Sequence, residues 1–238
     1  DSSHESDIEQ QLTFSNGYIC QTAHFEEFYS GPQRLCTFIN GIEHPILNLS
    51  SISVRLHDER LDIANWQVKK FYRCLHKNQP TLERHFTATS PKGATLQIKS
   101  KRHLLETKEV MVIEYEVSSV DYAGPISFLA MLGASEEKVD WYPLKNYIGQ
   151  DYCWLWLQMY ELNLQLCCAM TWSVCYNNTP IIQRPIKIEK QHTIGYSLTT
   201  NIKPGDTCML QKKVVIMDSR THEKDQLIID SIQCLTNS

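Results

Sequence analysis

Neighbouring glutamates are the residues of this 238-residue chain whose type and spacing come closest to acid–base chemistry. They form two pairs, Glu26–Glu27 and Glu136–Glu137. Cleavage of a glycosidic bond requires two carboxyl groups at a set separation, or one acid and a phosphate. Adjacent side chains of an extended chain point to opposite faces, so neither pair converges on one bond. We therefore expect one carboxylate of Glu26–Glu27 to cap the adjacent loop and the other to be solvated, and we expect Glu136–Glu137 to lie in an exposed loop.

Aromatic side chains are the second set with chemical potential, because an indole or phenol ring presents a large apolar face. The apolar faces of sugars stack on such rings, and Trp141 and Tyr142 lie in a polar stretch between predicted strands. These two residues are the candidate carbohydrate contacts. Trp154, Trp156 and Trp172 alternate with other apolar residues, which predicts core positions for them instead.

Charge and composition limit the classes of partner. The chain has 23 Lys and Arg against 27 Asp and Glu, a formal net charge of -4. Its basic cluster at 99–103 is followed closely by Glu106 and Glu109, whereas binding to nucleic acid requires a basic face. The most apolar stretch, 152–175, is interrupted by polar residues and is too polar for a membrane span. We therefore predict neither a nucleic acid nor a membrane as partner.

Nine cysteines are present, an odd number, so at least one thiol is free or pairs between chains. No C-x-x-C pair occurs, and the adjacent Cys167 and Cys168 suit neither a zinc site nor an easy local disulfide. The histidines are dispersed, so we predict no metal and no cofactor. We expect reduced core cysteines and a cytoplasmic location, while sequons at Asn48 and Asn177 keep open a periplasmic one after removal of a signal.

Hydrophobic residues recur with a period of two along much of the chain, which is typical of half-buried strands. Residues 62–65 read as a turn, and Lys203-Pro204-Gly205-Asp206 predicts a β-hairpin between strands at 193–202 and 208–217. The other strong strand patterns lie at 52–56, 66–75, 96–101, 111–118, 152–162 and 164–175, the last two apolar enough to be covered on both faces.

Helix signals are confined to the C-terminal end. Thr221 is a good N-cap residue, and Glu223 and Asp225 would favour the first helical turn. One face of the following segment is apolar, so we expect this helix either to fold back on the sheets or to associate with another chain. Many strands without alternating βα units predict an all-β sandwich with a short C-terminal helix.

An ordered series of short motifs near the N-terminus carries a family resemblance. An apolar strand precedes the motifs Asn16-Gly17-Tyr18, Phe25-Glu26-Glu27 and Asn40-Gly41-Ile42. The series resembles the opening of the N-terminal domain of glycoside hydrolase family 65, which includes maltose, trehalose and kojibiose phosphorylases. Segments 94–102 and 114–116 resemble the family too, and the recognisable motifs span residues 8–135. The family usually has Gly before Phe-Glu-Glu where this chain has Ala23-His24, so the local turn is expected to differ.

The resemblance implies a fold and a role. The fold is a single domain over residues 1–238, a large two-sheet antiparallel sandwich of the galactose mutarotase-like type, with 1–8 flexible and 221–238 beginning a linker helix. In whole family members that linker leads to an (α/α)6 barrel that carries the general acid. The chain is then a non-catalytic domain of an enzyme acting on α-glucosides, and it supports the barrel, oligomer contacts and the shape of the substrate site. Its implied partners are the barrel, a second copy in a homodimer, and carbohydrate.

The resemblance leaves no catalytic residue on this chain and suggests structural positions. Structural turns or a barrel interface are the roles it implies for Asn16, Gly17, Glu26, Glu27, Asn40 and Gly41. Two alternatives remain: a free-standing carbohydrate-binding module, and a mutarotase-like enzyme in which a Glu and a His converge on a sugar ring. Glu161, Glu189 and His192 are the candidates for that second site.

Overall fold

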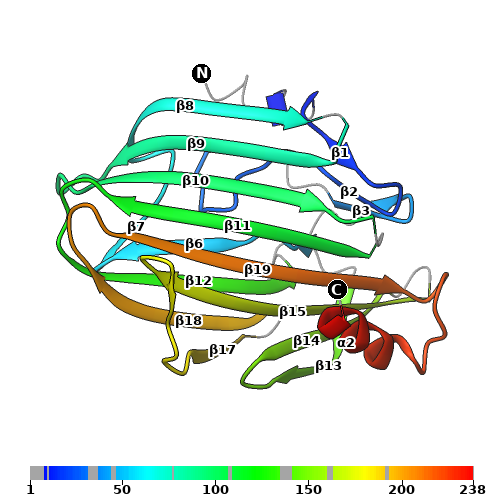
Figure 1. The fold of residues 1–238 in the computed structure, drawn as a ribbon. Coiled ribbons are helices and arrows are strands. Elements are labelled where there is room, and N and C mark those ends of the chain that lie inside the picture. Colours follow the sequence, from blue (N-terminus) through cyan, green and yellow to red (C-terminus); the bar gives the residue numbers. More distant parts are fainter. Residues whose placement is uncertain are drawn as a thin grey trace.

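Two large antiparallel sheets face each other, and a small third sheet lies at one end of the sandwich (Figure 1). The computed structural model describes residues 8–9, 11–31, 37–43, 47–76, 78–106, 109–134, 141–159, 163–190 and 193–237. The predicted all-β sandwich is confirmed. Glu136, Glu137, Glu161 and His192 fall outside the described residues.

The larger sheet has nine strands among the described residues and forms the front layer of Figure 1. Eight of the strands follow the order β13-β14-β15-β19-β11-β10-β9-β8, and β16 pairs with β15 beside this path. Their bounds are β8 Gln67–His76, β9 Thr81–Thr89, β10 Thr95–Leu104, β11 Val110–Ser119, β13 Trp141–Ile148, β14 Tyr152–Met159, β15 Leu164–Tyr176, β16 Thr179–Pro180 and β19 Thr207–Asp218.

The second large sheet has six strands in the described part of the chain, in the order β17-β18-β12-β6-β7, with β5 paired to β12. Their bounds are β5 Leu47–Asn48, β6 Ile52–Leu56, β7 Glu59–Arg60, β12 Gly124–Ala134, β17 Ile186–Lys190 and β18 Thr193–Ile202. The small sheet consists of β1 Phe14–Ser15, β2 Ile19–Gln21, β3 Thr37–Ile39 and β4 Ile42–Glu43.

The core lies between the two large sheets, as the period of two predicts. On β11, Ile113 and Tyr115 are buried, while the intervening Glu114 is only half-buried. Phe128 of β12 and Tyr196 of β18 enter the same cluster from the opposite sheet. Burying side chains of this size contributes about 1.5–3 kcal/mol each, so this shared core holds the two layers together.

The predicted hairpin around residues 203–206 is wrong. The turn itself forms, with Gly205 at φ 88° and the Asp206 amide donating to the Lys203 carbonyl at 3.0 Å. The strands on its two sides belong to different sheets: β18 lies between β17 and β12, and β19 lies between β15 and β11. The turn residues specify a reversal of the chain but not the partner of each strand. The turn is therefore an arch from one layer of the sandwich to the other.

The C-terminal helix begins later than its sequence signals predict. Helix α2 spans Leu227–Asn237, six residues beyond Thr221. The Thr221 and His222 amides both donate to the Asp218 carbonyl, at 3.3 and 3.1 Å. Thr221 therefore completes the turn that follows β19, and the chain reaches helical geometry only after it.

Helix α2 folds back on the outer face of the larger sheet, over β15 and β19 (Figure 1). Leu227 and Leu235 are buried there in a second hydrophobic cluster, against Cys167, Ala169 and Val215. The inward-facing Cys168 and Met170 of β15 are also buried, so this strand is covered on both faces as predicted. In the described part of the chain, no helix is long and apolar enough to cross a membrane.

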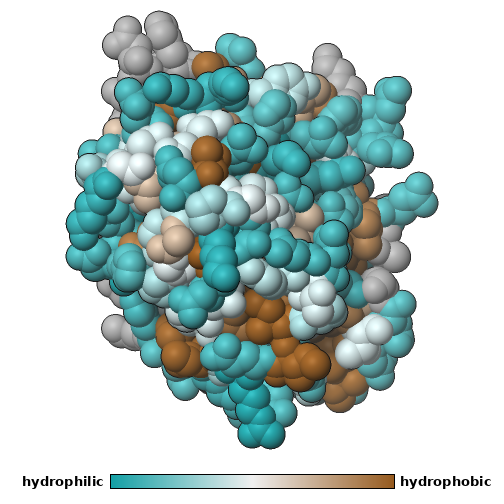
Figure 2. Space-filling view, turned by 60° about the vertical axis from the view of Figure 1, so that its left-hand side comes forward, coloured by the Kyte–Doolittle hydropathy of each residue, from teal (hydrophilic) through white to brown (hydrophobic). Residues whose placement is uncertain are grey.

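The side chains on the outward faces of the strands are mostly polar. The face shown in Figure 2 is largely hydrophilic, with hydrophobic side chains gathered toward the lower edge of the view. Ile182 and Ile186, which precede and begin β17, are the most exposed large hydrophobic side chains of the described residues. Two exposed isoleucines thus lie at the β17 margin of the smaller sheet.

Candidate functional site

Glu26 and Glu27 lie in a buried ionic cluster against the inner face of the larger sheet. Their residues are only 2% and 3% exposed. Both carboxylates pair with Arg84 of β9, with Arg84 Nη2 2.6 Å from Glu27 Oε2. Arg102 of β10 places its Nε 2.6 Å from Glu26 Oε1, and the Tyr115 hydroxyl of β11 donates to Glu27 Oε1 at 2.5 Å. These five residues are called the Glu–Arg cluster below.

The expectation of one capping and one solvated carboxylate is therefore wrong. Arg84 and Tyr115 both stand opposite Ser100 in the sheet register, so they share one row on its buried face. A buried arginine requires a buried counter-charge, because an isolated ion in a protein interior costs several kcal/mol. The two adjacent glutamates supply it together.

The Glu–Arg cluster also connects the two layers. The carbonyl of Glu26 accepts a hydrogen bond from the Ile52 amide of β6 at 2.9 Å, while its carboxylate pairs with strands of the opposite sheet. His24 adds a further tie, because its carbonyl accepts from Arg102 Nη2 at 2.6 Å and its Nε2 lies 2.6 Å from Ser50 Oγ. The Ala23-His24 departure from the family pattern thus places a buried imidazole in this contact.

Burial and the neighbouring charges shift the pKa values of several groups in and beside the cluster. Burial by itself would raise the pKa of Glu26, but the Arg102 and Arg84 guanidinium groups outweigh it and lower that pKa to about 2. Burial, with the nearby Glu27 charge, raises the pKa of Tyr115 well above its usual value. Burial also keeps the pKa of His24 well below 6.5, with help from the Arg102 charge. A general acid or base must also reach its substrate, and Glu26 and Glu27 are both buried.

The two Asn-Gly motifs lie in the turns of the small sheet. Asn16-Gly17 joins β1 to β2 and Asn40-Gly41 joins β3 to β4, with positive φ angles at Gly17, Asn40 and Gly41. Asn16 Oδ1 accepts from the amides of Tyr18 and Ile19, at 3.1 and 2.9 Å. These contacts fix the geometry of the turn and leave no group poised for catalysis in it.

The Asn16 and Asn40 turns are each tied to the larger sheet. Asn16 Nδ2 donates to the Leu105 carbonyl at 2.9 Å. Arg220 donates from Nη1 to the Asn40 carbonyl at 2.9 Å and from Nη2 to the Ile39 carbonyl at 2.6 Å. The small sheet is thereby attached to the segments that follow β10 and β19 of the larger sheet.

The predicted carbohydrate contacts Trp141 and Tyr142 lie at the start of the edge strand β13, opposite Met159 and Gln158 of β14. The side chain of Trp141 falls outside the described residues, and that of Tyr142 is partly buried. Glu189, a candidate of the mutarotase-like alternative, lies on β17 and accepts from Asn146 Nδ2 at 3.1 Å. Glu161 and His192, the other two candidates of that alternative, lie outside the described residues.

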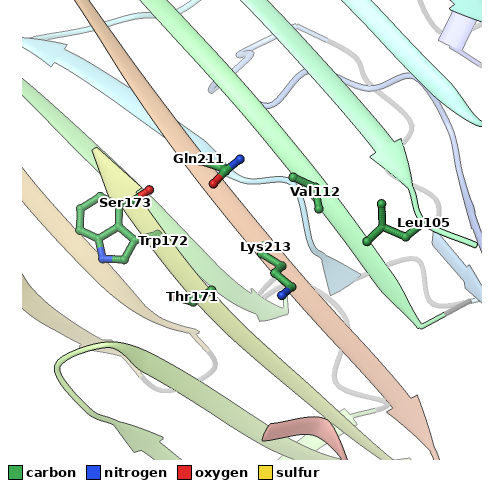
Figure 3. A pocket seen from close by; sticks show the side chains of 7 residues that line it. All are labelled: Leu105, Val112, Thr171, Trp172, Ser173, Gln211 and Lys213. Atoms are coloured by element: carbon green, nitrogen blue, oxygen red, sulfur yellow. The ribbon is translucent and has the colours of Figure 1, made fainter. Parts of the chain in front are cut away.

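A hollow of about 370 Å³ opens on the outer face of the larger sheet, where β11, β19 and β15 run side by side (Figure 3). Its lining is formed by Leu105, Val112, Thr171, Trp172, Ser173, Gln211 and Lys213. Lys213 Nζ donates to the Leu235 carbonyl at 2.7 Å, which ties the hollow to the end of α2. Among the described residues, no group of His, Cys, Asp and Glu is arranged to hold a metal ion.

These features define a class of protein: a large antiparallel β-sandwich domain whose clustered carboxylates are buried in ion pairs and whose outer face carries a hollow. Residues 1–236 match the family described as Glycosyl hydrolase family 65, N-terminal domain. The chain belongs to this family, as its Asn-Gly-Tyr and Phe-Glu-Glu motifs indicate.

Two known proteins place this domain within longer chains. The chain is 26% identical over 154 residues to the alpha,alpha-trehalose phosphorylase of Thermoanaerobacter brockii, a match that covers 54% of this chain and 20% of that protein. A solved structure described as a kojibiose phosphorylase from human microbiome superposes with a TM-score of 0.87 at 17% identity, covering 99% of this chain and 34% of the other. The chain thus spans between a fifth and a third of the length of these relatives.

Sequence reasoning missed the partners of the two glutamates and the whole outer hollow. Arg84 lies between the inward-facing Leu82 and Phe86 of β9, and Arg102 lies beside the inward-facing Leu104 of β10. An arginine at an inward-facing position of a strand was the sequence signal that a buried counter-charge is needed. The hollow had no local signal, because Val112, Thr171 and Gln211 become neighbours only through strand pairing.

Proposed function

We propose that this chain is the non-catalytic N-terminal domain of a family 65 phosphorylase or hydrolase acting on α-glucosides, where it supports a catalytic barrel and helps to shape its substrate site. The family match over residues 1–236 is the observation that carries the proposal. The buried, strongly ionised Glu26 supports it as well, because the most conspicuous carboxylates are committed to folding and not to chemistry.

The contact with the barrel is proposed to use the aromatic surface beside the Glu–Arg cluster. Phe28 and Phe71 are each 41% exposed, and Arg60 lies over the Phe28 ring at 4.1 Å. Phe71 stacks on Phe86 and meets the edge of Phe25, whose neighbours in sequence are the clustered glutamates. Both exposed rings therefore flank the segment that carries the clustered glutamates, and the core of an intramolecular interface is rich in such aromatic side chains.

The central test compares the 238-residue chain with the product of the complete gene. Each is incubated with maltose, trehalose and kojibiose, with and without phosphate. The complete product is expected to release glucose or glucose phosphate, and the chain alone is expected to release neither. Sustained turnover by the chain alone that disappears when one carboxylate is replaced would overturn the proposal, and a reading frame ending at Ser238 would favour a free-standing binding module.

A paired substitution tests the contact surface in the complete protein. Phe28→Ala with Phe71→Ala is expected to lower the melting temperature and the turnover, since an interface core loses two aromatic anchors. The matched control is Ile182→Ala with Ile186→Ala, which removes exposed apolar side chains from the margin of the smaller sheet. If only the isoleucine pair reduces activity, the barrel contact lies on that margin and the assignment to Phe28 and Phe71 is wrong.

A further inference from the structure

Strand β17 forms one edge of the smaller sheet and has no partner strand on its outer side among the described residues. It pairs with β18 at five consecutive positions, from Ile186 opposite Ser197 to Lys190 opposite Thr193. We propose that this edge pairs antiparallel with the same edge of a second copy of the chain, around a two-fold axis at Ile188. The smaller sheet then continues from one copy into the other, in an interface that is independent of the supporting role proposed above.

The other edge strands of the two large sheets have features that discourage such pairing. In β13, Pro143 has no amide donor, and the register with β14 shifts between Pro143 and Lys145. In β8, the register with β9 shifts between Lys69 and Tyr72, and Lys70 has φ 52°. Strand β7 has two residues. Prolines, bulges and short length commonly keep a sheet edge from pairing with another chain, and β17, with five residues in regular register, has none of them.

The charged side chains of β17 match one another under the two-fold axis. In an antiparallel pair centred on Ile188, Lys187 of each copy stands opposite Glu189 of the other. Opposite charges stabilise directly opposed residues, and like charges destabilise them. An axis centred one residue away, at Lys187 or at Glu189, would set that residue against its own copy, so like charges would meet. The charge pattern therefore selects the pair centred on Ile188, which closes the interface at two copies.

Both charged side chains are exposed and already oriented at this margin. Lys187 stands opposite the buried Tyr196, so Lys187 and Glu189 lie on the face of β17 that is turned toward the larger sheet. There Lys187 Nζ donates to the Ile148 carbonyl at 2.8 Å, and Glu189 Oε1 accepts from Asn146 Nδ2 at 3.1 Å. An ammonium group has three donors and a carboxylate has two acceptor oxygens, so both groups keep capacity for a second copy.

The opposite face of β17 is apolar at its first and third residues. Ile186 is 66% exposed, and Ile188 on the same face is half-buried. In the pair centred on Ile188 this side chain meets its own copy, and Ile186 meets the aliphatic stem of Lys190, which removes apolar surface from water. Specific complexes bury about 1,200–2,000 Å², and a pair of five-residue strands covers less, so we expect a weak and reversible dimer.

Sedimentation velocity of the 238-residue chain measures this association. Between roughly 1 and 300 µM the sedimentation coefficient is expected to rise, with a dissociation constant on the order of 10–100 µM. Glu189→Lys and Lys187→Glu each set like charges opposite one another in the pair, and each should weaken association at least about fivefold. Because both side chains are exposed, the melting temperature of the dilute chain should not change. The matched control, Lys203→Glu, reverses an exposed charge in the arch between the sheets and should associate as the unaltered chain does.

Mixing the two variants tests the pairing itself. An equal mixture of the Glu189→Lys and Lys187→Glu chains should associate as strongly as the unaltered chain, because each copy then meets opposite charges on the other. Damage to the strand would not be repaired by mixing. The unaltered chain remaining a monomer, equal association by the single variants, or a mixture that stays monomeric would each overturn the proposal. So would a complete gene product on which Glu189→Lys has no effect, since the rest of that longer chain would then cover β17.

Discussion

A carboxylate shut away from water needs a cation within hydrogen-bonding distance, and the Glu–Arg cluster satisfies two carboxylates with two arginines and a phenol. The arrangement is mutual, since Arg84 and Arg102 would be equally costly without the glutamates. The N-terminal motif Phe25-Glu26-Glu27 is therefore a folding feature of this domain. Its charges join the first segment of the chain to three central strands.

Removing one arginine from the cluster should expose this dependence. Arg84→Met leaves the buried Glu26 with Arg102 and the buried Glu27 with the Tyr115 hydroxyl, and it should reduce the free energy of unfolding by about 3–5 kcal/mol. Urea unfolding of parent and variant measures the loss. The control is Lys99→Met, which breaks the outward-facing ion pair with Glu116 and should change stability by about 1 kcal/mol or less. Equal losses in the two variants would show that the buried pairing contributes no more than a surface one.

At the scale of elements, helix α2 acts as a cover for the outer face of β15 and β19. Its buried side contains Leu227 and Leu235, while Ile229 is 48% exposed. Of the two outcomes expected from its apolar face, the structure shows the fold-back on the sheet. The helix therefore completes a second small core and also supplies the Leu235 carbonyl that positions Lys213.

Truncating the buried side of α2 should destabilise the whole domain. Leu227→Ala and Leu235→Ala are each expected to reduce the free energy of unfolding by about 2–5 kcal/mol, because each leaves a cavity against the sheet. Ile229→Ala on the exposed side of the same helix should change it by about 0.5 kcal/mol or less. Thermal and urea unfolding report all three. If the leucine variants match Ile229→Ala, the helix contributes nothing to the stability of the sandwich.

At the scale of the molecule, Lys212 joins the two layers through their interior. It stands on the inward phase of β19, fully buried, and its Nζ donates to the carbonyls of Met131 and Ser51 at 2.7 and 3.2 Å. Burial lowers the pKa of this amine from 10.5 to about 7. The contact between the sheets thus contains a group that changes its charge near neutral pH.

This group should make stability depend on pH. The unfolded chain protonates Lys212 below about pH 10.5, but the folded chain does so only below about 7. Between these values the unfolded state binds more protons, so the contribution of Lys212 to stability falls as the pH falls toward 7 and is constant below it. The free energy of unfolding of the parent minus that of Lys212→Met should therefore rise from pH 7 to pH 9, by up to about 1.4 kcal/mol per pH unit.

Urea unfolding at several pH values measures that difference, and pairing parent with variant cancels the titration of the other groups. Lys203→Met, which alters an exposed lysine in the arch between the sheets, should show no such slope. A flat difference for Lys212→Met across this range would mean that the buried amine keeps an ordinary pKa.

The local sequence by itself determined which residues face inward and what kind of protein this is. The alternation that buries Ile113 and Tyr115 is a property of consecutive residues, because side chains of a strand point alternately to its two faces. The Asn16-Gly17 and Asn40-Gly41 turns are local as well, since a residue at positive φ is favoured by Gly or Asn whatever surrounds it. The family assignment rests on such short motifs in order.

Only the tertiary structure decided which distant residues meet. Glu26 and Arg84 are 58 positions apart, and their burial follows from how the N-terminal segment crosses the sheet. The turn at 203–206 is the same whether its strands pair with each other or separate into two layers, so the partners of β18 and β19 were settled by the packing of the other strands. Strand pairing and layer packing depend on contacts across the whole chain, and no window of neighbouring residues contains them.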